Sequence, residues 1–116
     1  MATTLNTSYN VKDANVSLTI IIGDGQFGSS AVLLDSEKKT NGHNITNYPL
    51  GSGSSLDGKT LRIVTIVSDT NPSTTNMDVT YQFKGGVADQ NFSLSDAVAS
   101  QGDALTFDAS FVFHKV

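Results

Sequence analysis

The chain lacks cysteine and tryptophan, and its 116 residues include only two prolines, one arginine and one glutamate. Without cysteine it has no disulfides, thiol nucleophiles or cysteine-bound zinc. Without tryptophan it lacks the largest aromatic surface on which a sugar ring can stack. No apolar run approaches the roughly 20 residues that cross a bilayer, so we expect no membrane insertion.

Positive charge is also scarce. Seven Lys and Arg residues stand against eleven Asp and Glu, a net charge of -4, and only Lys38 and Lys39 are adjacent. Nucleic-acid binding requires a clustered basic surface, so nucleic acids and anionic membrane surfaces are excluded as partners. Residues 1–6 have neither the basic segment nor the apolar core of a signal peptide. The location therefore stays open, with the cytoplasm as the default.

Small polar residues are abundant, because Ser, Thr, Asn and Gly make up 46 of the 116 residues. Helical domains are rich in Ala, Leu and Glu, which are few here, and apolar side chains recur at every second position. We predict one all-β domain over residues 1–116, a two-layer antiparallel β-sandwich of about eight strands. Its topology is expected to be Ig-like or jelly-roll-like.

The expected strands cover residues 5–11, 16–22, 27–34, 45–50, 61–67, 77–83, 91–98 and 105–113. The first is edge-like, and Pro49 makes the fourth an edge strand as well. Residues 61–67 are apolar at almost every position, which predicts a central strand buried on both faces. Residues 35–44 and 51–58 are predicted to be loops. The last strand carries a core stripe at every second position: Leu105, Phe107, Ala109, Phe111 and Phe113.

Two glycine patterns match nucleotide-binding motifs. Residues 53–60 (GSSLDGKT) fit the phosphate loop, which needs a following helix whose first N–H groups face the phosphates. Residues 61–67 are instead rich in β-branched side chains, which favour a strand. Nucleotide binding through Lys59 and Thr60 is therefore the weakest of three functional hypotheses.

Residues 23–28 (GDGQFG) fit the dinucleotide pattern, which also requires a helix after the last glycine. Residues 29–40 lack the i, i+3, i+4 apolar spacing of an amphipathic helix. Asp24 and Gly25 lie between two apolar runs, which is typical of a hairpin turn. We predict that residues 16–22 and 27–34 form such a hairpin.

No catalytic set is evident, and we predict a non-enzyme without a metal site. His43 and His114 are far apart with no third ligand nearby, and no serine has a G-x-S-x-G frame. Many of the ten Asp residues lie at predicted turns, where Asp and Asn are common in any case. Calcium is the one cofactor that such oxygen-rich loops favour. The best candidate ligand residues flank one loop: Asp69, Asn71, Asn76 and Asp78.

The leading hypothesis is a non-catalytic interaction or assembly module that acts through its surface or edge strands. Its partner would be another protein or a second copy, because the first predicted strand carries few charges and is open to strand pairing. The alternative is a lectin-like, carbohydrate-binding module, with calcium as an assisting ion. Tyr48, beside Pro49 on an edge, is the aromatic platform in that alternative.

Overall fold

The computed structural model describes residues 2–116, and the all-β prediction is confirmed. Nine strands follow one another, interrupted by a single helical turn. They are β1 (Ala2–Val11), β2 (Asn15–Ile22), β3 (Phe27–Leu34), β4 (Glu37–Gly42), β5 (Ile45–Ser52), α1 (Gly53–Leu56), β6 (Thr60–Ser68), β7 (Asn76–Lys84), β8 (Gln90–Ala97) and β9 (Ala104–Lys115).

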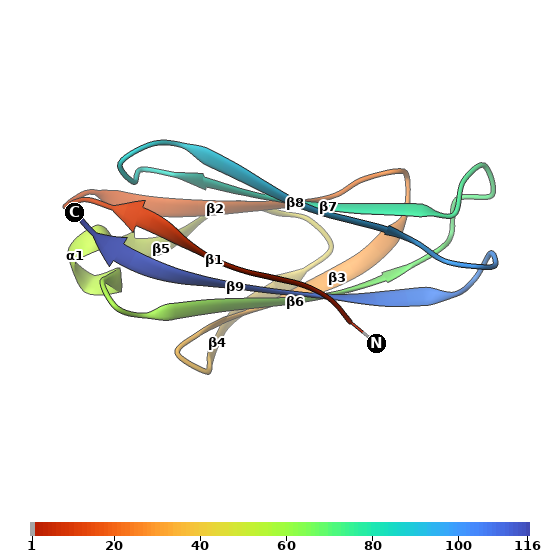
Figure 1. Ribbon diagram of the computed structural model, residues 1–116, viewed down its shortest axis with the longest axis horizontal. Helices are drawn as coiled ribbons and strands as arrows, with labels where there is room; N and C mark the ends of the chain where they lie inside the picture. Colours follow the sequence, from red (N-terminus) through yellow and green to blue (C-terminus); the bar gives the residue numbers. More distant parts are fainter. Residues whose placement is uncertain (1) are drawn as a thin grey trace.

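The strands form two stacked sheets, so the predicted two-layer sandwich is confirmed (Figure 1). Sheet A has the order β1-β9-β6-β3-β4, and sheet B has the order β5-β2-β7-β8. All pairs are antiparallel except β1 with β9, which run parallel over ten consecutive positions. The first and last strands of the domain therefore lie side by side, and β1 forms one edge of sheet A.

The core lies between the sheets and is built by period-two alternation, as the sequence predicts. The last strand buries Phe107, Ala109, Phe111 and Phe113, and Leu105 packs against them partly exposed. Phe83 on β7 contacts Phe111 across the layers, with ring centroids 4.8 Å apart. Because aromatic rings bury large apolar areas, this cluster supplies much of the force that holds the two sheets together.

Three hydroxyl groups lie within this apolar core. Ser30 and Thr65, both fully buried, share a hydrogen bond of 2.7 Å between their hydroxyl oxygens. The Tyr81 hydroxyl is buried and makes no hydrogen bond within residues 2–116. Burial raises the pKa of Tyr81 to about 12, and the nearby Thr65 hydroxyl offsets only part of this effect.

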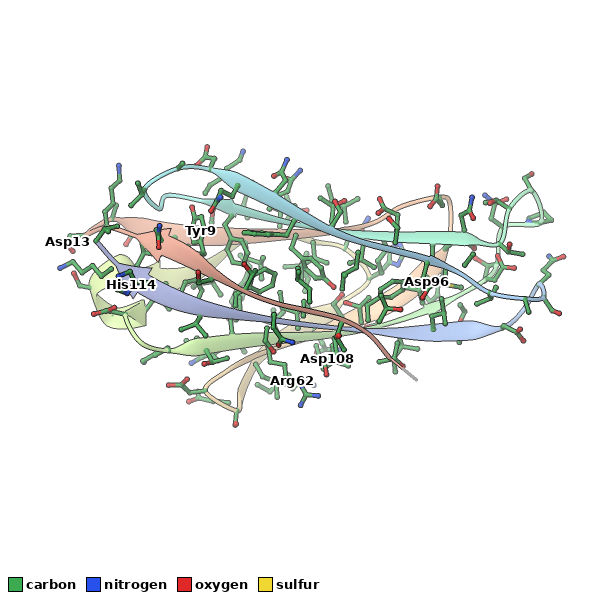
Figure 2. The ribbon with its side chains drawn as sticks, viewed as in Figure 1. Tyr9, Asp13, Arg62, Asp96, Asp108 and His114 are labelled. Atoms are coloured by element: carbon green, nitrogen blue, oxygen red, sulfur yellow. The ribbon has the colours of Figure 1, made fainter. Side chains whose placement is uncertain are left out.

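The prediction that residues 61–67 are buried on both faces is wrong. Strand β6 is central in sheet A, but its side chains alternate between the core and solvent. Ile66 is 54% exposed, and Arg62 pairs with Asp108 on the same outer face (Figure 2). A two-layer sandwich covers each sheet on one face only, so even a central strand keeps one face in water.

The predicted hairpin of residues 16–34 is also wrong, although its turn is present. Asp24 and Gly25 have positive φ angles of 57° and 67°, and the Gln26 N–H donates to the Gly23 carbonyl at 3.2 Å. The turn nevertheless joins β2 in sheet B to β3 in sheet A. Ile22 and Val32 are buried from opposite sheets, so packing both apolar runs into one core separates the strands.

Both predicted loops contain regular structure. Residues 37–42 form β4, which pairs with β3 through a tight turn at Asp35 and Ser36, with φ angles of 48° and 71°. Strand β4 is polar along its length and therefore shows no apolar alternation. Residues 53–56 form α1, where Ser52 accepts from the Ser55 N–H and Leu56 is buried.

The strand predicted after Thr60 is confirmed as β6, so no helix follows the phosphate-loop pattern. The N–H groups of this loop are also used inside the chain. Gly58 donates to the Phe113 carbonyl at 2.9 Å, and Lys59 donates to the Leu56 carbonyl at 2.9 Å. These two N–H groups are therefore not free to bind an anion in the way that those of a phosphate loop do.

Candidate functional site

Three loops meet at one end of the sandwich, on the right in Figure 1: β2–β3, β6–β7 and β8–β9. Backbone hydrogen bonds join two of them. Asp69 donates its N–H to the Asp103 carbonyl at 2.9 Å, and Gly102 donates to the Asp69 carbonyl at 3.1 Å. This end carries four of the five predicted ligand residues.

Asp69 is buried inside the fold and does not face a ligand. It is 2% exposed, and its Oδ1 accepts from Gln26 Nε2 at 2.8 Å, while its Oδ2 has no partner within residues 2–116. Gln26, itself 4% exposed, also accepts from the Thr70 and Asn71 N–H groups at 2.8 and 2.9 Å. Gln26 thus holds the β6–β7 loop in place, and no pattern in the sequence marks it for that role.

The side chain of Asn71 also forms hydrogen bonds with loop backbone. Its Nδ2 donates to the Asp24 carbonyl at 2.8 Å, and its Oδ1 accepts from the Ser73 N–H at 3.0 Å. A Cβ on Gly25 would lie 2.8 Å from Asn71 Nδ2. Asn71 therefore packs onto the β2–β3 turn, and both of its amide atoms are engaged by the backbone.

Asn76 and Asp78 do face a common hollow, which is open and has a volume of about 590 Å³. Asp78 accepts from the Ser95 hydroxyl at 2.8 Å. The hollow carries three carboxylates and no basic side chain, so its character is acidic. It is lined by Asp24, Asn76, Met77, Asp78, Ser95, Asp96 and Ala97.

Asp96 links this hollow to the edge of the other sheet. Its carboxylate accepts from the Thr3 hydroxyl of β1 at 2.6 Å and from the Ala97 N–H at 2.8 Å. The Thr3 hydroxyl, followed by the Ala97 N–H, holds the pKa of Asp96 below its ordinary value. In Figure 2, Asp96 lies on the β8 side of the molecule, toward the end where the loops meet.

Tyr48 lies elsewhere. It is half-buried on β5, opposite Leu18, and its hydroxyl donates to the Lys39 carbonyl at 3.3 Å. Leu18 is also opposite Phe83, five residues along β7 from Asp78. At about 3.3 Å per residue, this places Tyr48 roughly 16 Å along the strands from the hollow. Tyr48 and the Asp-rich end are not one site.

The four edge strands are a second candidate site. Two of them, β4 and β5, carry features that prevent pairing with another strand, and we call this the blocked side. Strand β4 has Glu37, Lys38 and Lys39 among six residues and an irregular register with β3. Strand β5 has Pro49 and two register shifts against β2. Charges, proline and bulges are the features with which natural sheets prevent edge-to-edge pairing.

The edge formed by β1 is different, because residues 2–11 (ATTLNTSYNV) contain no charge, proline or glycine. Its register with β9 is unbroken over all ten positions. Leu5 packs against the core partly exposed, and Thr4, Asn6 and Ser8 are exposed. Such an edge is a ready template for another strand.

Two hydrogen bonds fix which backbone groups of β1 face outward. The Val11 carbonyl accepts from the Val116 N–H at 3.0 Å, toward β9, whereas the Asn10 carbonyl accepts from the Val87 N–H at 3.1 Å, away from β9. The N–H and C=O groups of alternate residues point to opposite sides of a strand. The groups that face the open edge are therefore those of the even-numbered residues Thr4, Asn6, Ser8 and Asn10.

The two ends of β1 differ in attachment. Tyr9 is fully buried and stacks on Phe83 at 4.8 Å between centroids. Its hydroxyl donates to the Ala88 carbonyl at 2.7 Å and accepts from the Gly86 N–H at 3.0 Å. The β7–β8 loop thus covers the Tyr9 end of the edge, and the stretch from Thr4 to Ser8 is left open.

Comparison with protein-family models, with curated proteins and with solved structures finds no significant match to this chain. Within residues 2–116, no three His, Cys, Asp or Glu side chains are grouped so that they could hold a metal ion. The same part of the chain contains no helix of the length and apolarity needed to cross a membrane. The sheet edges and the acidic hollow are therefore the features that bear on function.

Proposed function

We propose that the protein is a non-catalytic assembly module that associates through the edge of β1. The observation that carries this proposal is the contrast between edges. Of the four edges formed by residues 2–116, only β1 is at once uncharged, free of proline and regular in register. Strand β8, beside it, carries the charged residue Asp96. The Asp96 carboxylate already accepts a hydrogen bond from the N–H of Ala97, the last residue of β8.

Sedimentation velocity over a range of protein concentrations tests this proposal. We expect reversible self-association, because a paired strand would supply backbone hydrogen-bond partners, in place of water, to the outward N–H and C=O groups of β1. Asn6→Lys adds a charge to the open edge and should weaken association about tenfold, which corresponds to roughly 1.4 kcal/mol.

Asn41→Lys is the matched control, since Asn41 is an exposed asparagine on the blocked edge strand β4. It should leave association unchanged. A protein that sediments as a monomer at every concentration would contradict the proposal, as would equal effects of the two substitutions.

Carbohydrate binding at the acidic hollow is the second candidate. Asn76 and Asp78 supply amide and carboxylate groups suited to sugar hydroxyls, and both line the hollow. This candidate is weaker, because the lining residues include no aromatic ring. Thermal shift with a sugar panel tests it. A shift that Asp78→Ala abolishes and Tyr48→Ala retains would support the hollow, and a shift that survives Asp78→Ala would exclude it.

A further inference from the structure

We infer that the occupant of the β1 edge is the β1 strand of a second copy, antiparallel to the first and related to it by a two-fold axis at Leu5. This inference rests on the proposed function and specifies its partner and geometry. It follows from the free backbone groups, their alternation and the chemistry of the other edges.

The choice of a second β1 strand comes from elimination among the edges of residues 2–116. A partner edge must offer unpaired backbone groups without a charge, proline or bulge in the way. Strand β4 fails through Lys38 and Lys39, β5 through Pro49, and β8 through Asp96. The edge that complements β1 in this chain is β1 itself.

The register follows from the free stretch. The Asn10 carbonyl is already occupied by the Val87 N–H, so the outward-facing groups available lie before it, at Thr4, Asn6 and Ser8. Leu5 is the partly exposed apolar residue beside these groups, and a two-fold axis at Leu5 brings the two Leu5 side chains together. An antiparallel pair with its axis there places Thr4 of each copy opposite Asn6 of the other, so that both residues exchange hydrogen bonds.

Leu5 then faces Leu5 of the second copy in a non-hydrogen-bonded pair, the class in which side chains lie closest. Leu5 is partly exposed in the single chain, so the pairing would bury apolar surface at the seam. Sheet A of one copy would continue into sheet A of the other. Because both copies use the same patch, the assembly closes as a dimer and does not grow into a fibre.

The absence of cysteine allows a direct test with single-cysteine variants of the full chain. Cα atoms in a non-hydrogen-bonded antiparallel pair are about 4.5 Å apart, within the range that a disulfide spans. Under mild oxidation, Leu5→Cys should form covalent dimers at least about tenfold faster than the control Asn41→Cys, because pairing raises the effective concentration.

A second pair of variants covers the case in which Leu5→Cys impairs folding. Thr4→Cys and Asn6→Cys alter exposed side chains, and a mixture of the two should cross-link faster than either alone. Faster cross-linking of Asn6→Cys alone would place the axis at Asn6, a register displaced by two residues, and overturn the axis at Leu5.

The outcomes separate this inference from the proposed function. If the unmodified protein dimerises but neither Leu5→Cys nor the mixture cross-links, self-association stands and the β1–β1 geometry is wrong. Loss of the dimer in Phe27→Ser would instead place the contact on the outer face of sheet A, where Phe27 is 61% exposed. If the unmodified protein is monomeric throughout, the proposed function fails and this inference fails with it.

Discussion

The two open sides of the sandwich carry opposite chemistry. On the side of β4 and β5, charged residues, a proline and register shifts interrupt both edges. On the side of β1 and β8, one edge is long, regular and uncharged, and it is covered by a loop at one end only. Since an unprotected edge invites pairing, the difference is the basis of the proposed contact at β1.

The largest expected effect comes from detaching β1. Tyr9→Ala removes a fully buried ring stacked on Phe83 and should lower the free energy of unfolding by about 3–5 kcal/mol. Tyr48→Ala, on the blocked side, removes a half-buried ring and should cost clearly less. Urea denaturation of both variants checks this. Equal losses would contradict the view that β1 depends on one buried anchor.

Alkaline pH tests the core that both sides share. Burial raises the pKa of Tyr81 in the folded protein to about 12, above its ordinary value of 10.0. The stability that the protonated Tyr81 contributes to the fold is therefore full below pH 10 and is lost as the pH rises toward 12. Two pKa units correspond to about 3 kcal/mol. Urea denaturation between pH 8 and 11 should show the decline, and Tyr81→Phe should reduce it. An identical decline in Tyr81→Phe would assign it to other groups.

Removing the charges of β4 should make this edge resemble the uncharged edge of β1. Replacing Glu37, Lys38 and Lys39 together by Thr removes the charges of β4, all of which lie on exposed positions. Stability should change by no more than about 0.5 kcal/mol, as is usual at the surface. Self-association measured by light scattering should increase. No increase would mean that these charges do not block pairing at β4.

The smallest effect is expected where β1 meets β8. Thr3→Val removes the hydroxyl that chiefly lowers the pKa of Asp96, so this pKa should rise toward its ordinary value. In the unmodified protein the Thr3–Asp96 hydrogen bond contributes its full stability above the ordinary pKa of an Asp. This contribution is lost as the pH falls through the lowered pKa of Asp96. Carboxyl NMR titration measures this. The pKa of Asp108, lowered by Arg62, should not move and serves as the control.

Much of the fold could be predicted from the sequence, because alternation reports which residues face the core. It located β2, β7 and β9, and Pro49 correctly marked β5 as an edge strand. It failed for β4, whose side chains are polar on both faces, and for the outer face of β6, where Ile66 imitates a buried position. The Asp24–Gly25 turn was recognised, but its chemistry does not state which sheet the next strand joins.

The candidate sites were predictable in part. Asn76 and Asp78 do share a hollow, while Asp69 is buried against Gln26 and Tyr48 lies on another edge. These differences depend on which loops meet in space, and a single sequence does not record that. The low charge of the first strand was visible, but its parallel pairing with β9 and its outward-facing groups required the structure.

Amide hydrogen exchange along β1 measures the open edge most directly. At low protein concentration the N–H groups of Thr4, Asn6 and Ser8 should exchange rapidly, while those of Leu5 and Thr7, which face β9, should be protected. At high concentration the even-numbered amides should become protected as the second copy pairs with them. Slow exchange of all five amides at low concentration, or no change with concentration, would contradict an open β1 edge that serves assembly.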